Sequence, residues 1–361
     1  MQRPKRSCLR LIGIYGVGHF LVDASCAALV FSASAAGRLP LSIAMVAVLT
    51  YNLLAFASQP ILGWFVNDTS SAHVWARAGA LTTALAYAAS QMSAGIWPAV
   101  LLAGLGNAAF HVGGGVLALR VEPGRAAAPG LFVAPGAAGL AAGIWMGGHQ
   151  WYAWFPALAL ALAIPFLSGL PEVASRRPLD GRSPPTALLV AAVGVLFAVV
   201  AMRAFVGSGI VLPWKSEPGL LVALTAAVVI GKGAGGVLAD RFGRLAIGGG
   251  ALVLSAPFLM IAPTSATAGV AGMLLFNMTM PVTLVAVADL FPERPGFAFG
   301  LTCLALIAGA LPVMLHLVRT IAPVPVVLWV LGSAALLWYG LTWRDRDEAA
   351  SAPFRPDPEE V

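Results

Sequence analysis

The sequence predicts an all-α integral membrane protein whose twelve transmembrane helices form two bundles of six. Hydrophobic residues make up 59% of the 361 residues and charged residues only 10%, whereas soluble domains carry about 25% charged residues. The apolar residues are gathered in runs of about 20, the length that crosses a bilayer as a helix. The longest polar interruption, PEVASRRPLDGRSPP at 171–185, leaves six such runs on each side.

The polar residues between the runs place each transmembrane helix along the chain. The helices are expected at 9–36, 39–64, 74–94, 96–119, 128–148, 151–170, 187–212, 219–238, 245–262, 266–290, 297–318 and 322–343. This predicts four parts, namely an N-terminal bundle at 1–170, a linker at 171–186, a C-terminal bundle at 187–343 and a tail at 344–361.

The distribution of Lys and Arg predicts the orientation in the membrane. With a cytoplasmic N-terminus, most basic residues, Lys232 among them, fall at or near the cytoplasmic side. Only three fall on the opposite side, namely Arg38, Lys215 and Arg319. This asymmetry follows the positive-inside rule. We therefore expect a multi-pass protein of the cell's inner (plasma) membrane with both termini cytoplasmic.

The loop after the eighth run carries the most specific motif, GVLADRFGR at 236–244. Gly236 would let two helices approach closely, and Asp240 could accept hydrogen bonds from N–H groups at a helix N-terminus. Arg241 and Arg244 place positive charge in a predicted cytoplasmic loop. This loop resembles the signature loop of the major facilitator superfamily of transporters.

The resemblance implies the major facilitator fold and a conformational gate. The gate would comprise Gly236, Asp240, Arg241, Gly243 and Arg244, and it would lock the cytoplasmic side. The first half holds a degenerate copy, with Asn67 and Asp68 in the places of Asp240 and Arg241. The alternative is an ordinary basic loop between two helices.

Few ionisable or amide side chains lie at bilayer depth, where they are costly and usually functional. His19 and Asp23 are four residues apart and share a helix face, as do Asn107 and His111. We expect Asp23 and His19 to exchange a proton. Arg203 would bind an anion or tune Asp23.

The other polar residues at bilayer depth are expected to contact the substrate. They are Asn107, His111, Asn277 and Thr283. The alternatives stay open: His19 and Asp23 could be a local pair, Arg203 a bundle anchor, and the two asparagines interhelical hydrogen-bonding groups.

The fifth run has small residues at helical spacing, including Gly136, Gly139 and Gly143, and Pro135 could bend it. It is similar to the fifth-helix motif of proton-coupled exporters, although Pro-Gly replaces the usual Gly-Pro. The resemblance implies that Gly139 lies at a moving interface with the eighth helix. Generic small-residue packing is the alternative.

Two further patches, Gly18–Asp23 and Gly106–His111, resemble the fosmidomycin-resistance branch of the superfamily. That branch implies efflux of a small polar or anionic compound in exchange for protons.

The sequence therefore predicts a secondary active transporter, a proton antiporter that exports a small polar or anionic compound by alternating access. The alternative is an organic-anion uptake carrier or facilitator without proton exchange. An enzyme is not expected, because His19, His111 and His316 fall on separate helices at different depths. No ATP-binding motif, cofactor or metal site is expected. The expected partners are a small-molecule substrate, protons and the lipid bilayer. Nucleic acid is not expected, and the protein is expected to be a monomer.

Overall fold

The computed structural model describes residues 4–35, 39–92, 95–149, 154–168 and 186–342, and within them the chain is helical. The elements of the N-terminal half are α1 (Pro4–Ala35), α2 (Leu41–Asn52), η1 (Leu53–Ala57), α3 (Gln59–Phe65), α4 (Thr69–Ser90), α5 (Trp97–Val121), α6 (Ala127–Gly148), α7 (Phe155–Ala163) and η3 (Ile164–Ser168). Those of the C-terminal half are α8 (Thr186–Gly209), η4 (Pro213–Ser216), α9 (Pro218–Phe242), η5 (Leu245–Gly249), α10 (Gly250–Ile261), α11 (Ala266–Asn277), α12 (Thr279–Leu290), α13 (Pro295–Met314) and α14 (Pro323–Leu341).

Each of the twelve predicted runs coincides with a helix or with a pair of helices in line. In the described part of the chain, nine segments are long and apolar enough to cross a membrane, and two more, Phe155–Leu167 and Leu245–Ile261, are shorter apolar helices. The remaining one, α4, has 22 residues and a more polar composition. The predicted all-helical membrane architecture is confirmed. Of the predicted linker only Thr186 is described, as the first residue of α8, and the tail at 344–361 lies outside the described residues.

Three of the membrane segments are interrupted. The second contains the π-helical turn η1 between α2 and α3, and the ninth begins with the π-helical turn η5. The tenth divides at Met278 into α11 and α12. Pro60 and Pro281 lie just beyond two of these interruptions, and proline lacks the N–H group that an unbroken helix needs. Interrupted helices expose backbone carbonyl groups inside the membrane, where transporters commonly bind substrate.

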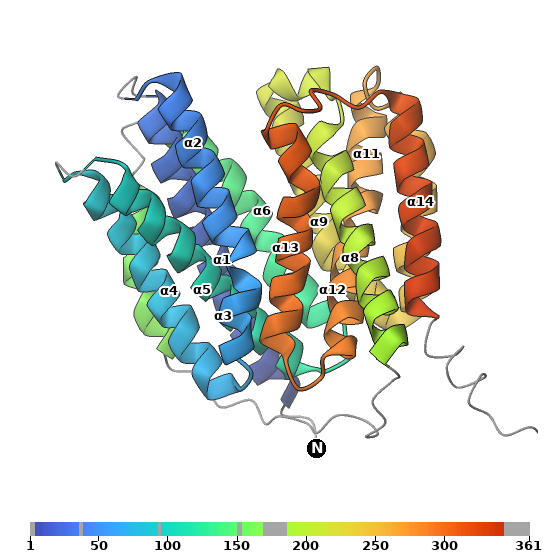
Figure 1. Cartoon of the computed structure of the whole chain (residues 1–361), viewed down its shortest axis with the longest axis horizontal. Coiled ribbons are helices and arrows are strands. Elements are labelled where there is room, and N and C mark those ends of the chain that lie inside the picture. Colours follow the sequence, from blue (N-terminus) through green and yellow to red (C-terminus); the bar gives the residue numbers. More distant parts are fainter. Residues whose placement is uncertain (1–3, 36–38, 93–94, 150–153, 169–185, 343–361) are drawn as a thin grey trace, which may run out of the picture.

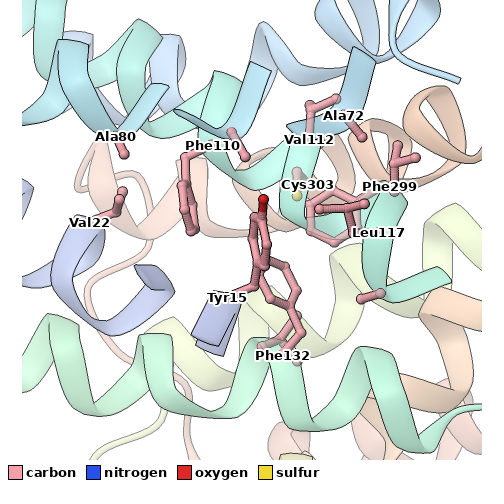
Figure 2. Close-up of a cluster of buried hydrophobic side chains, with 14 of the residues drawn as sticks. Tyr15, Val22, Ala72, Ala80, Phe110, Val112, Leu117, Phe132, Phe299 and Cys303 are labelled. Carbon is pink, nitrogen blue, oxygen red and sulfur yellow. The ribbon is translucent and has the colours of Figure 1, made fainter. Parts of the chain in front are cut away.

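Figure 1 shows the two bundles side by side, with α1 to α6 on one side and α8 to α14 on the other. Large aromatic side chains connect their cores (Figure 2). Tyr15, Phe110 and Phe132 are fully buried in the N-terminal half. The ring centroid of Phe132 lies 6.3 Å from that of Phe299 on α13. The two cores are therefore in contact through aromatic packing.

The closest approaches between the halves lie toward the end of the molecule where α3 and α9 finish, which we call the closed side. A methyl group on Gly63 would overlap the backbone of Gly296, and one on Gly236 would overlap the carbonyl of Ala126. In Figure 1 the bundles converge toward this end. The predicted orientation would make the closed side cytoplasmic.

The small-residue face of α6 does not contact α9 in the way that the sequence suggested. Methyl groups on Gly139 and Gly143 would overlap the backbone of Phe20 and Ala24, which belong to α1. The prediction that Gly139 packs against the eighth helix at a moving interface is therefore wrong for this structure. The part of α6 that approaches α9 includes its first turns, around Gly130. The glycines beyond Pro135 instead hold α6 against α1 within one half.

Candidate functional site

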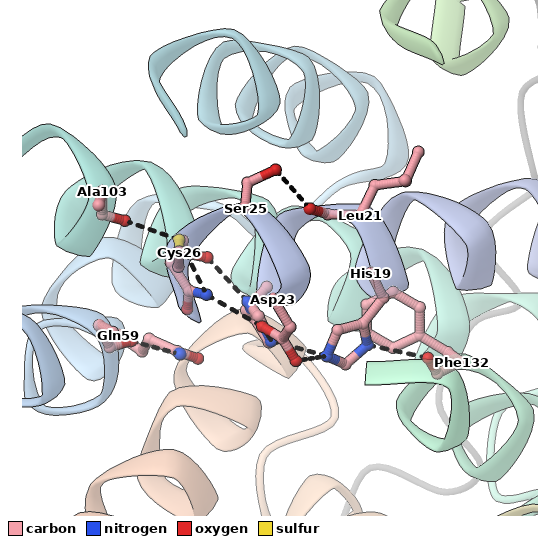
Figure 3. A network of polar contacts seen from close by, with 11 residues as sticks. His19, Leu21, Asp23, Ser25, Cys26, Gln59, Ala103 and Phe132 are labelled. Carbon is pink, nitrogen blue, oxygen red and sulfur yellow. Dashed lines mark hydrogen bonds and ion pairs between the residues drawn. The ribbon is translucent and has the colours of Figure 1, made fainter. Parts of the chain in front are cut away.

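Four polar side chains from α1 and α5 meet in the N-terminal half, and Figure 3 shows two of them, His19 and Asp23. His19 Nε2 lies 3.2 Å from Asp23 Oδ2, and His111 Nε2 lies 3.6 Å from Asp23 Oδ1. Asn107 Nδ2 donates a hydrogen bond of 3.1 Å to Asp23 Oδ1. The two histidine Nε2 atoms are only 2.7 Å apart. The structure therefore brings together His19, Asp23, Asn107 and His111, which we call the histidine–aspartate cluster.

Local sequence explains how this cluster can form. The spacing of four residues places His19 beside Asp23 on α1, and Asn107 beside His111 on α5. The third wall is α6, where Gly136 has no side chain. A methyl group at Gly136 would overlap His19 Nε2 and lie 2.6 Å from Asp23 Oδ2. Glycine at this position is what lets the two polar side chains lie against the backbone of α6.

Hydrogen bonds to backbone carbonyls fix the protons on both imidazole rings. His19 Nδ1 lies 2.9 Å from Phe132 O, and His111 Nδ1 lies 2.9 Å from Asn107 O. A carbonyl oxygen can only accept, so both Nδ1 atoms must carry hydrogen. If both rings were neutral, neither Nε2 atom would carry hydrogen, and their lone pairs would point at each other. Their separation of 2.7 Å is that of a hydrogen bond, which requires one additional proton between them.

A proton placed between the two rings would be shared by them, and the adjacent Asp23 carboxylate would balance its charge. Asp23 is also the most accessible member of this trio, with 19% of its side chain exposed against 6% for His19 and 8% for His111. Chemically, the arrangement offers three adjoining acceptors for a proton, one of which, Asp23, is partly exposed. Such a cluster can take up, hold and release a proton.

The same three side chains also have the composition of a metal site. One ligand atom from each lies within 4.8 Å of the others. However, two imidazole nitrogens on a tetrahedral zinc ion would be about 3.3 Å apart, given metal–nitrogen bonds of roughly 2.0–2.1 Å. The observed separation of 2.7 Å is shorter than this and fits a hydrogen bond instead. The arrangement in this structure therefore has the geometry of a hydrogen-bonded pair of rings, with proton exchange at His19 and Asp23 still a prediction.

Arg203 is not part of the histidine–aspartate cluster. It is buried on α8, where its NH2 group donates a 2.9 Å hydrogen bond to Phe276 O and its guanidinium lies 5.0 Å from the centroid of the Phe276 ring. The predictions that Arg203 would approach His19 and Asp23 in one site and tune Asp23 are therefore wrong for this structure. Instead, Lys232 on α9 lies within electrostatic range of both Asp23 and Arg203.

Asn277 and Thr283 also lie apart from the cluster. Asn277 ends α11, half-buried, and donates to Met273 O. Thr283 is buried in α12 and donates within its own helix, to Thr279 O and Met280 O. Asn277 lies beside the break between α11 and α12, where Arg203 donates to Phe276 O. Thr283 is packed inside α12 and its neighbours. The substrate contacts predicted for these two residues stay predictions.

The loop at 236–244 joins the two halves on the closed side. Asp240 Oδ1 and Oδ2 accept hydrogen bonds of 2.7 and 3.0 Å from the backbone N–H groups of Ala126 and Ala127, at the start of α6. Arg244 NH1 forms a 2.6 Å ion pair with Asp289, and its NH2 group donates to Gly124 O. The helix-end contact expected for Asp240 is thus present, and it crosses between the halves.

Two other residues of this loop have distinct positions. Gly243 ends α9 with φ of 94°, a conformation that favours glycine. Arg241 is exposed, and its guanidinium lies 5.1 Å from the centroid of the neighbouring Phe242 ring. The gating role proposed for the whole motif stays a prediction, and the cross-half contacts fall on Gly236, Asp240 and Arg244.

Sequence reasoning missed Lys232 and Gln59. Lys232 was assigned to the cytoplasmic side, but α9 continues ten residues beyond it, or roughly 15 Å. Counting helical rise back from the signature loop could have revealed its depth.

Gln59 is fully buried at the start of α3, with Nε2 donating to Ala55 O and Oε1 without a partner among the described residues. A lone glutamine inside an apolar run was the available signal.

Comparison with known proteins identifies the fold. No family model matches the sequence, and no curated protein sequence is similar to it. Among solved structures, the E. coli fucose:proton symporter FucP is similar, with a TM-score of 0.63 and 10% identity over 94% of this chain and 98% of that one. A major facilitator superfamily transporter, FucP, in the outward conformation gives a TM-score of 0.63 and 11% identity over 94% of this chain and 99% of that one. The chain thus has the major facilitator fold expected from its signature loop.

Proposed function

We propose that the protein is a proton-coupled secondary transporter of a small polar or anionic compound, working by alternating access. The fold supports this class, because its two six-helix bundles can rock about a site between them. The observation that carries the proton coupling is the short contact between His19 Nε2 and His111 Nε2 beside Asp23, since this contact needs an additional proton.

The proposed cycle uses the one partly accessible member of the cluster. Asp23 receives a proton from the side opposite the closed side, and the proton is then shared with the two histidines. Rocking of the bundles exposes Asp23 to the other side, where the proton leaves. The closed side must separate at Asp240 and Arg244 in the same step, because both residues contact the N-terminal half.

Reconstituted protein tests the proton coupling. A thermal-shift screen of the purified protein against metabolites and antibiotics would first supply a transported compound. In proteoliposomes, Asp23→Asn should then leave transport with no dependence on the pH gradient. Asp68→Asn, at the N-cap of α4, is a matched control that should keep the dependence. Full dependence on the gradient in Asp23→Asn would refute the proposal.

The direction of transport stays a prediction from the sequence. The prediction of export was based partly on the exporter-like motif of the fifth helix. The glycines of that motif beyond Pro135 pack against α1, within one half of the protein. Uptake of an organic anion is the second candidate. The buried cation Arg203, whose Nε atom has no partner in the described part of the chain, favours an anionic substrate. Right-side-out and inside-out vesicles with opposed pH gradients would distinguish export from uptake.

A further inference from the structure

We propose that Lys232 and Arg203 form an oxyanion subsite at the break between α11 and α12, and that Lys232 makes anion and proton binding cooperative. The proposal rests on the proton site described above and names the substrate class that goes with it. The substrate would carry a carboxylate, sulfonate or phosphonate group that binds between the two cations.

Arg203 supplies the first cation. Its side chain is buried, with the residue 7% exposed, and its Nε atom has no hydrogen-bond partner in the described structure. Among the described residues its hydrogen-bond partner is Phe276 O, a carbonyl at the end of α11. A guanidinium has five N–H groups, and leaving buried donors unsatisfied is costly. An oxyanion that occupies the free donors would remove this cost.

Lys232 supplies the second cation, from a helix that packs against the N-terminal half. Its carbonyl faces Gly130 of α6, and its neighbour Gly231 packs against Leu274 and Asn277 of α11. Lys232 therefore belongs to the same level as the break to which Arg203 binds. Among the described residues its ammonium group has no hydrogen bond and no ion pair, although it lies within electrostatic range of Arg203. Two cations within electrostatic range of each other, with no ion-pair partner among the described residues, are suited to binding an anion.

The geometry also connects Lys232 to the proton site. Gly130 and Gly136 are six residues apart on α6, or roughly 9 Å. A methyl group at Gly130 would meet the backbone carbonyl of Lys232, and one at Gly136 would meet the side chains of His19 and Asp23. The positive charge of Lys232 acts on Asp23 across this interval. Lys232 is thus shared between the proposed anion subsite and the histidine–aspartate cluster.

The charges in this region determine the sign of the coupling. With a proton on the histidine pair, Asp23 is balanced, and Lys232 and Arg203 leave two positive charges. The positive charge of Lys232 opposes proton binding at the cluster. An anion bound to Lys232 would offset that charge and favour the proton. By linkage, the proton favours the anion equally.

Other titratable groups near Asp23 come from several helices. They are His19 and Cys26 on α1, Tyr51 on α2, His111 on α5, Lys232 on α9 and Cys303 on α13. The packed helix α6 has no titratable side chain between Ala127 and Gly148. Among these groups Lys232 is the cation that does not lie in the cluster itself. Cooperative binding of anion and proton would load both together, as in a symporter.

Thermal-shift titration of purified protein with simple probes tests the proposal. Benzenesulfonate keeps its charge at every pH used, and uncharged benzenesulfonamide is its control. Benzoate and benzamide form a second pair for a carboxylate. We expect the anions alone to stabilise the wild-type protein. The apparent affinity for benzenesulfonate should be about tenfold higher at pH 5.5 than at pH 8, within the usual range of coupling between sites.

Variants separate the anion subsite from the proton site. Lys232→Met should weaken benzenesulfonate binding about tenfold and remove its pH dependence, whereas Lys232→Arg should restore both. Lys215→Met, an exposed lysine in η4, should behave as wild type. Asp23→Asn should bind the anion equally at both pH values. Equal binding of anion and neutral probes, or unchanged pH dependence in Lys232→Met, would overturn the proposal. Retained pH dependence in Asp23→Asn would instead count against the proton site.

Discussion

Gly136→Ala offers the sharpest test of the histidine–aspartate cluster, because it changes the wall of the cluster without removing a polar group. The new methyl group would overlap His19 Nε2 and lie 2.6 Å from both Asp23 Oδ2 and His19 Cδ2. Favourable contacts between carbon atoms are about 3.5–4.0 Å long, so the side chains must move by about 1 Å. A movement of that size would lengthen the Nε2–Nε2 contact from 2.7 Å beyond hydrogen-bonding range.

The expected cost follows from the lost contact. A hydrogen bond to a charged group contributes about 1.5–3 kcal/mol, and overpacking costs about 1–3 kcal/mol. A loss of about 2 kcal/mol in proton binding corresponds to roughly a 30-fold change in the proton equilibrium, since every 1.4 kcal/mol is tenfold. Gly136→Ala should therefore lose most of its response to a pH gradient.

The assay compares initial transport rates in proteoliposomes with and without a pH gradient. Gly148→Ala is the matched control, because it makes the same substitution in the same helix at a position with no atom within 4 Å of the new methyl group. Thermal melts of both variants would detect global unfolding. If folded Gly136→Ala responds to the gradient as wild type does, the close packing of His19 and Asp23 against α6 is not needed for coupling.

Three further changes test other contacts. Asp240→Ala removes the cap on α6, so transport should slow several-fold with substrate affinity nearly unchanged, and a large loss of affinity at normal turnover would contradict the gating role. Gly139→Leu should lower the melting temperature, since its side chain would overlap the backbone of Phe20, and a normal melt would refute the packing of α6 on α1. Gly63→Ala should wedge the closed side apart at Gly296, raising cysteine accessibility there, and unchanged accessibility would exclude that seam.

The fold could be predicted from the sequence because bilayer thickness sets helix length. A run of about 20 apolar residues has few alternatives to a membrane-spanning helix. The cluster was partly predictable for the same reason. The spacing of His19 from Asp23, and of Asn107 from His111, places each pair on one helix face whatever the tertiary structure.

The predictions that were wrong depended on tertiary structure, namely on which face of a helix packs against which neighbouring helix. Arg203 was expected near Asp23, but the rotation of α8 in its bundle directs the guanidinium to Phe276 O. Gly139 was assigned to the wrong partner helix. Small residues indicate that another helix packs closely, but they do not indicate which helix it is, and in the structure it is α1. Lys232 was misplaced for a different reason, since its charge was counted with the loop although α9 continues well beyond it.

The two seams of the closed side differ in chemistry, and this difference separates a latch from a pivot. The α6–α9 seam is fastened by the carboxylate of Asp240 and the guanidinium of Arg244, so its strength depends on charge and can be released by water. The α3–α13 seam packs backbone directly against backbone at Gly63 and Gly296, and beside it the Arg294 guanidinium lies over the Trp64 ring. Opening would then begin at the latch and turn about the glycine contact. In such a transporter, substitutions at the latch could change the turnover rate while the residues that determine substrate specificity stay unchanged.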